Sequence, residues 1–186
     1  MAGRSAEPEG ACGWGRKALG LAVGGATFLA AIPAALALAS PPLDAWLRLP
    51  RALPEPLNLV VAPPLISLGL FLTAWSGLVQ LRVGEGTPVP AIPTRRLVTS
   101  GPYALCRNPM LLGSTVYYLG IGFLLNSIST MMLVALFLAT SVVYIKLVEE
   151  RELEERFGRE YVEYKRRTPF LIPSLRRAEK EPEETS

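Results

Sequence analysis

The sequence contains no histidine, and this absence removes several common chemistries at once. Without histidine there is no histidine general base, no histidine metal ligand, and no imidazole to activate a serine or cysteine nucleophile. Cysteine is scarce too, because Cys12 and Cys106 lack the spacing of a metal site or a disulfide framework. We therefore expect no metal site and no histidine-dependent catalysis.

Charge is absent from three long stretches, residues 18–43, 56–81 and 108–145. A helix needs about 20 apolar residues to cross the ~30 Å hydrocarbon core of a bilayer. The first two stretches fit one crossing each. The third is nearly twice as long, and Asn126-Ser127 predicts a tight turn between short crossings at 109–125 and 128–146. The sequence therefore predicts an all-α integral membrane protein with four transmembrane helices, the last two forming a helical hairpin.

The basic residues gather in a few segments of the chain. Of the 19 lysines and arginines, ten lie from Lys146 onward, and others lie before residue 18 and in the loop 82–107. The positive-inside rule places these segments in the cytosol, so we expect a multi-pass protein with both termini cytosolic. The charge-free helices lack the ionisable groups usual in transporters. No feature favours nucleic acid as a partner.

Four regions follow from this pattern. Residues 1–15 are small and polar, and we expect them to be disordered. Transmembrane helices one and two occupy 16–82, joined by a proline-rich outer loop at 40–57. An alternative for the N-terminus is a cleaved signal peptide, because Arg16-Lys17 precedes an apolar run with small residues at its end.

The third region, 83–173, contains a loop, helices three and four and a C-terminal helix. The fourth region, 174–186, is a solvated tail. After helix four the sequence predicts a charged, amphipathic, cytosolic C-terminal helix, which Gly158 can break into two pieces.

A polar constellation is expected at the cytosolic interface. It combines the loop Arg95–Tyr103, the turn Arg107–Met110 and the pair Glu149-Glu150. Because helices three and four form a hairpin, Asn108 and Glu149 can meet. The N-terminus of helix three suits a carboxylate and the glutamates suit an ammonium, so a zwitterionic ligand matches both. The alternative is that the glutamates only cap a solvated tail helix.

Two runs of sequence carry a family resemblance. The run LVTSGPYALCRNPMLLG, followed by EERELEERFGREYVEYKRRTPFLIP, resembles the isoprenylcysteine carboxyl methyltransferase and phospholipid methyltransferase family. These are membrane enzymes that use S-adenosylmethionine, and the resemblance covers roughly 84–173. It implies that region 83–173 binds the cofactor. The residues it implies as cofactor contacts are Arg95, Arg96, Leu97, Val98, Tyr103, Asn108, Pro109, Met110, Leu111, Glu149 and Glu150.

The resemblance also implies a function, with departures. Better-known eukaryotic members have histidine where Asn108 stands, tyrosine where Leu111 stands and arginine where Ile145 stands. The function implied is S-adenosylmethionine-dependent methylation of a lipophilic acceptor, and we favour a carboxylate because it needs no base. The alternatives are phospholipid amine N-methylation, a non-enzymatic membrane protein that keeps the scaffold, and a membrane reductase of similar helical design.

Overall fold

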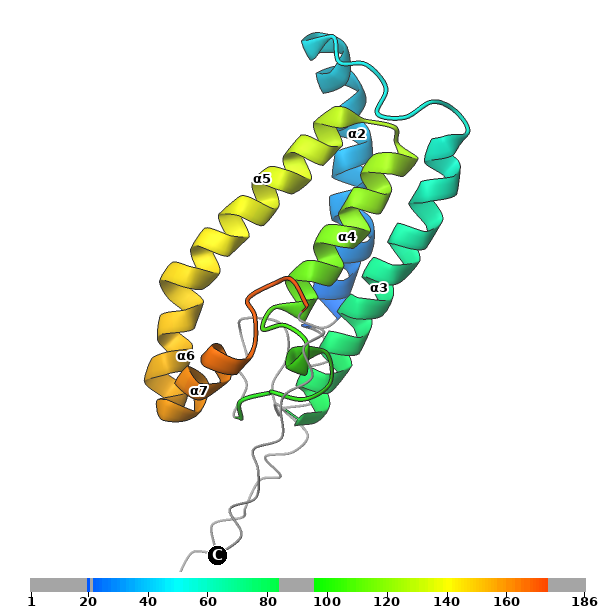
Figure 1. The fold of residues 1–186 in the computed structure, drawn as a ribbon. Helices are drawn as coiled ribbons and strands as arrows, with labels where there is room; N and C mark the ends of the chain where they lie inside the picture. Colours follow the sequence, from blue (N-terminus) through cyan, green and yellow to red (C-terminus); the bar gives the residue numbers. More distant parts are fainter. Residues whose placement is uncertain (1–19, 21, 84–95, 174–186) are drawn as a thin grey trace, which may run out of the picture.

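The computed structural model describes residue 20, residues 22–83 and residues 96–173, and every regular element in these ranges is helical (Figure 1). The all-α prediction is therefore confirmed. The main helices are α2 (Ile32–Leu47), α3 (Leu57–Val83), α4 (Pro109–Leu124), α5 (Ile128–Tyr144), α6 (Glu150–Phe157) and α7 (Arg159–Arg167). The described residues also contain two π-helical turns, η1 (Thr27–Ala31) and η3 (Ile145–Glu149), and the 3₁₀ helix η2 (Gly101–Ala104). The expectations for 1–15, Arg95 and 174–186 lie outside the described residues.

Helices α3 and α4 run side by side in close contact (Figure 1). A Cβ atom added at Gly69 of α3 would lie 2.3 Å from the backbone nitrogen of Tyr117 on α4. A Cβ atom at Gly113 of α4 would lie 2.6 Å from Oγ1 of Thr73 on α3. Small residues let helix backbones approach in this way, so the glycines bring the two helices together.

The predicted turn between the last two long helices is confirmed. Asn126 has a left-handed φ of 52°, and the Ser127 side chain caps α5 by accepting from the Thr130 backbone nitrogen. The Asn126 side chain also holds the preceding loop, since its Oδ1 accepts from the Leu53 nitrogen at 2.8 Å. From this turn α5 leans away from α4, so the two helices separate toward their other ends (Figure 1).

The first long helix extends further than the sequence indicated. We predicted a loop from residue 40, but the helix continues through Pro41 and Pro42 to Leu47, and this boundary was wrong. Proline is tolerated inside membrane helices where neighbouring groups re-satisfy the backbone. Here α2 also has strong partners on α5, because Ser40 and Thr130 share a 2.5 Å hydrogen bond and Asp44 accepts from the Ser129 nitrogen at 2.9 Å.

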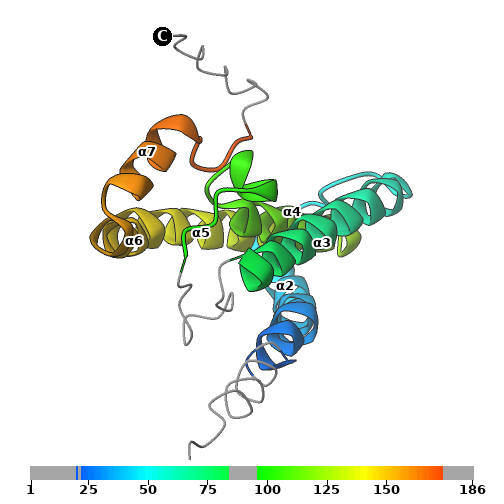
Figure 2. The ribbon, with the colours of Figure 1, turned by 90° about the horizontal axis from the view of Figure 1, so that it is seen from below.

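The C-terminal boundary of the last long helix was also predicted wrongly. The helix does not end near residue 146 but continues through η3 and α6, from Ile128 to Phe157. The expected break at Gly158 is confirmed, because its φ is 54°, a value that favours glycine. The chain then turns back as α7. Seen from below, α7 and α2 lie on opposite sides of the layer formed by α3, α4 and α5 (Figure 2).

Three of these helices are long and apolar enough to cross a membrane: Ala22–Leu47, Leu57–Val83 and Ile128–Phe157. The fourth apolar helix, Pro109–Leu124, is shorter. Their outward faces carry many exposed large apolar side chains, such as Leu38, Phe71 and Leu136. This is the surface expected of helices that face lipid.

Candidate functional site at the start of α4

The segment that leads into α4 is ordered by packing on α3. Val98 is buried, Leu97 is half-buried and Arg96 is exposed. Gly101 begins η2 with a left-handed φ of 62° and lies against Val79 of α3. The apolar residues of this loop therefore turn inward and fix its path beside the C-terminal end of α3.

Tyr103 lies between two helices that are far apart in sequence. Its hydroxyl donates to Oε1 of Gln80 on α3 at 3.1 Å, and its carbonyl accepts from the Tyr164 hydroxyl on α7 at 2.7 Å. Burial raises the pKa of the Tyr103 phenol above its usual value, and the negative charge of Glu149 raises it further. The phenol therefore stays protonated and neutral at physiological pH, and it can donate its hydrogen bond to Gln80.

The first turn of α4 begins at Asn108 and Pro109. Proline suits this position because the first helical N–H has no intrahelical acceptor. The Asn108 side chain does not cap the helix but donates from Nδ2 to the Phe170 carbonyl at 3.1 Å. Beyond it, Pro109 is buried, and Met110 and Leu111 are half-buried.

The two glutamates at the end of α5 have different surroundings. Glu149 is the last residue of a π-helical turn over Ile145–Glu149, and Glu150 follows it at the start of α6. Such turns are frequent at functional sites. Glu150 is buried, with 6% of its surface exposed, whereas Glu149 is exposed. Among the residues that the structure describes, no cation pairs with Glu149. A carboxylate in this position is available to an external cation.

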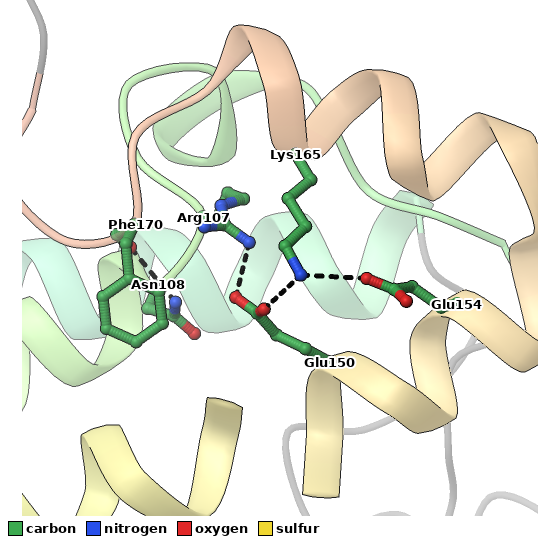
Figure 3. A network of polar contacts seen from close by, with 6 residues as sticks. All are labelled: Arg107, Asn108, Glu150, Glu154, Lys165 and Phe170. Atoms are coloured by element: carbon green, nitrogen blue, oxygen red, sulfur yellow. Dashed lines mark hydrogen bonds and ion pairs between the residues drawn. The ribbon is translucent and has the colours of Figure 1, made fainter. Parts of the chain in front are cut away.

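Glu150 joins three elements in one network (Figure 3). Its Oε1 lies 2.6 Å from Nη1 of Arg107, and its Oε2 lies 2.6 Å from Nζ of Lys165 on α7. Lys165 also contacts Oε1 of Glu154 at 2.9 Å. The carboxylate that connects to the start of α4 is therefore that of Glu150, and its partner is Arg107.

The segment after α7 covers the start of α4. The Pro169 carbonyl accepts from the Arg107 backbone nitrogen at 2.9 Å. The Phe170 ring lies near two cations, with the Arg107 guanidinium carbon 5.5 Å and the Lys146 Nζ 5.3 Å from its centroid. Both distances fall within the range of cation–π attraction.

The structure thus gathers most of the predicted residues at one end of the helices. The Tyr103 carbonyl accepts from the Tyr164 hydroxyl on α7. Asn108 lies next to Arg107, the ion-pair partner of Glu150. Sequence reasoning missed the roles of Tyr164, Lys165 and Phe170. Their only signal was that the second motif continues to residue 173, which pointed to a role for this segment without saying what it contacts.

Fold and site together define a class of protein. The chain is an all-helical membrane protein with three membrane-span candidates and a polar site at one end, formed by segments far apart in sequence. A family model for phospholipid methyltransferases matches residues 57–160, which is more than half of the chain. The chain belongs to this family, and the resemblance read from the two sequence runs is confirmed.

Curated relatives carry two kinds of name. The cobalt-zinc-cadmium resistance protein CzcN of Cupriavidus metallidurans is 35% identical over 118 residues, which cover 62% of this chain and 52% of that protein. The nickel-cobalt-cadmium resistance protein NccN of Alcaligenes xylosoxydans xylosoxydans is 32% identical, covering 59% and 53%. Protein-S-isoprenylcysteine O-methyltransferase B of Arabidopsis thaliana is 34% identical, covering 42% and 40%.

These relatives share only part of their length with the chain, which spans about half of the first two. No solved structure matches the chain significantly. Within residues 20, 22–83 and 96–173, no group of three or more histidine, cysteine, aspartate or glutamate side chains could hold a metal ion.

Proposed function

We propose that the chain is a membrane methyltransferase that uses S-adenosylmethionine and acts on a lipophilic acceptor. The observation that carries this proposal is the buried ion pair between Arg107 and Glu150, in which Nη1 and Oε1 lie 2.6 Å apart. It brings together the two separate sequence runs that resemble the methyltransferase family. Family membership and the apolar helices support a methyl acceptor that reaches the site from the membrane.

The residues at the site suit a zwitterionic cofactor. The Glu149 carboxylate, with which no cation pairs among the described residues, suits its ammonium. The N-terminus of α4 at Asn108 suits its carboxylate. The buried and half-buried side chains of Leu97, Val98 and Met110 suit its apolar parts. The resemblance also implies cofactor contacts by Arg95, Arg96, Tyr103, Pro109 and Leu111, and we assign these residues to cofactor binding as well.

S-adenosylmethionine supplies an activated methyl group when bound. The chain itself then has to align the acceptor and exclude water. We assign these tasks to the loop at Val98 and to the segment after α7, whose carbonyls at Pro169 and Phe170 accept from Arg107 and Asn108. No step in this reaction requires histidine, and the sequence has none.

The test of the cofactor is direct binding of labelled S-adenosylmethionine to protein purified in detergent. A charge-assisted hydrogen bond contributes about 1.5–3 kcal/mol, so Glu149→Ala should weaken binding roughly ten- to hundredfold. The matched control is Glu155→Ala, which removes an exposed glutamate of the neighbouring helix α6. Equal affinities of the two variants would contradict the assignment of Glu149. A parent chain without affinity would favour the scaffold alternative.

For the acceptor we propose a carboxylate. An alkylamine titrates near ~10 and is protonated at neutral pH, so its methylation needs a base, whereas a carboxylate is ionised above ~4–5. With labelled cofactor and a membrane extract, mild alkali should release the label as volatile methanol, because esters hydrolyse and N-methyl groups do not. Alkali-stable label on a phospholipid headgroup would instead establish the amine alternative.

We further propose four crossings, with α4 as the short one, and both termini in the cytosol. The support is the distribution of basic residues, which places the site, the loop before α4 and the C-terminal helices on the same side. In this orientation the cofactor reaches the site from the cytosol.

A further inference from the structure

Glu150 is a buried carboxylate whose two oxygens are each held by a different cation. Arg107 contacts Oε1 and Lys165 contacts Oε2, both at 2.6 Å, as Figure 3 shows. The side chains of Glu150 and Arg107 are only 8% and 11% exposed. Buried charges persist in proteins when they are paired and hydrogen-bonded in this way.

The three partners come from three elements. Arg107 immediately precedes Asn108, at which α4 begins, Glu150 begins α6, and Lys165 lies in the last turn of α7. Residues adjacent in sequence to Lys165 and Arg107 make the hydrogen bonds that connect the segments of the site. Tyr164, next to Lys165, donates to the Tyr103 carbonyl, and Asn108 donates to the Phe170 carbonyl.

We propose that Glu150 is a positioning residue that holds α7 and the segment after it against the start of α4, and that only Glu149 of the adjacent pair receives the cofactor. This rests on the proposed function. Glu150 is not free to bind the cofactor, because each of its two carboxylate oxygens already contacts a cation inside the protein. Glu149 is exposed and, among the described residues, has no paired cation.

A positioning role predicts that Glu150 acts through its partners. Removing one member of a buried ion pair leaves the other charge uncompensated, which is strongly unfavourable. A second substitution in the same network then adds little, because contacting residues are not additive. By contrast, substituting a residue that contacts the ligand independently of this network weakens binding by the same factor whether or not the network is intact.

The experiment is a set of double-mutant cycles, read by the dissociation constant of labelled S-adenosylmethionine. Glu150→Gln and Lys165→Met should each weaken binding severalfold, and the double variant should be about as weak as the worse single one. Glu149→Gln combined with Lys165→Met should instead give the product of the two losses. If the loss caused by Glu150→Gln is the same with and without Lys165→Met, Glu150 is a direct ligand and the proposal is overturned.

A second measurement does not depend on the cofactor. The midpoint of thermal unfolding in detergent should show the same non-additivity between Glu150 and Lys165, and Lys165→Arg, which keeps the charge, should restore both the midpoint and the affinity. Glu154→Gln is the control, because this half-exposed carboxylate contacts Lys165 but does not reach Arg107. Coupled midpoints without any cofactor binding would refute the proposed function alone, and uncoupled midpoints would refute the positioning role.

Discussion

Replacing Gly69 with alanine should force α3 and α4 apart. The added Cβ atom would lie 2.3 Å from the backbone nitrogen of Tyr117, 2.6 Å from its Cα and 2.7 Å from the Gly113 carbonyl oxygen. All three atoms belong to the backbone of α4, so no side chain can rotate away. Ordinary van der Waals contact begins at 3.4 Å, about 1.1 Å beyond the shortest of these distances.

The expected change in unfolding free energy combines the cost of the clash with the gain in helix propensity. Overpacking costs about 1–3 kcal/mol, and a gap of about 1 Å forfeits a quarter to a half of the dispersion energy of the contacts it opens. Because the clash involves backbone on a long interface, we expect the upper end, about 3 kcal/mol. Alanine offsets about 1 kcal/mol of this through its higher helix propensity. The net loss of about 2 kcal/mol lowers the unfolding midpoint by roughly 4–8 °C.

The matched control is Gly25→Ala, because nothing lies within 4 Å of a Cβ atom at that position. This variant keeps the gain in helix propensity without the clash, so its midpoint should stay unchanged or rise. Thermal unfolding of both variants in the same detergent decides the matter. If Gly69→Ala unfolds at the temperature of Gly25→Ala, then α3 and α4 do not pack through these glycines and the reasoning fails.

The remaining predictions concern topology, capping, a thiol and pH. Reporter fusions after residues 50 and 127 should read as external and a fusion after 178 as cytosolic, and the opposite pattern would remove the proposed orientation. Asp44→Ala removes the acceptor for the Ser129 nitrogen and should cost about 0.5–2 kcal/mol of unfolding free energy, measured by denaturation. Cys106 is 1% exposed and burial raises its pKa, so maleimide should label it only after unfolding. The hydrogen bond to Glu150 raises the pKa of Lys165, so its stabilisation is present below ~10.4 and is lost as the pH rises through the folded-state pKa. As the pH rises above ~10.4, the unfolding midpoint of the parent should therefore fall further than that of Lys165→Met. Equal falls would show that the pair contributes nothing to stability.

Much of the fold could be predicted because it depends on local features of the sequence. Charge-free stretches long enough to cross a bilayer predicted the helices, since an uncharged run of this length has few other stable forms. Asn126-Ser127 predicted the turn into α5 and Gly158 predicted the break before α7. In each case a single residue type has a backbone preference strong enough to act without tertiary support.

The ends of the helices were harder to predict, because tertiary packing can override the sequence signals, such as proline and charge, that indicate a helix end. Pro41 and Pro42 indicated a loop, yet α2 continues through them where Ser40 and Asp44 find partners on α5. The charge at Lys146 indicated the end of a membrane helix, yet the helix continues to Phe157. Charge marks a helix's exit from the bilayer, which need not coincide with the end of its hydrogen bonds.

The sequence by itself determined the helical class, the family and the segments that form the candidate site. Only the tertiary structure decided how those segments meet. Two adjacent glutamates are chemically equivalent in a sequence, but the π-helical turn that ends at Glu149 and the return of α7 leave Glu149 exposed and bury Glu150. A buried carboxylate is unfavourable unless cations pair with it. The cations that pair with Glu150, Arg107 and Lys165, lie 43 and 15 residues away along the chain. Pairings over such separations depend on the path of the whole chain, which no local pattern specifies.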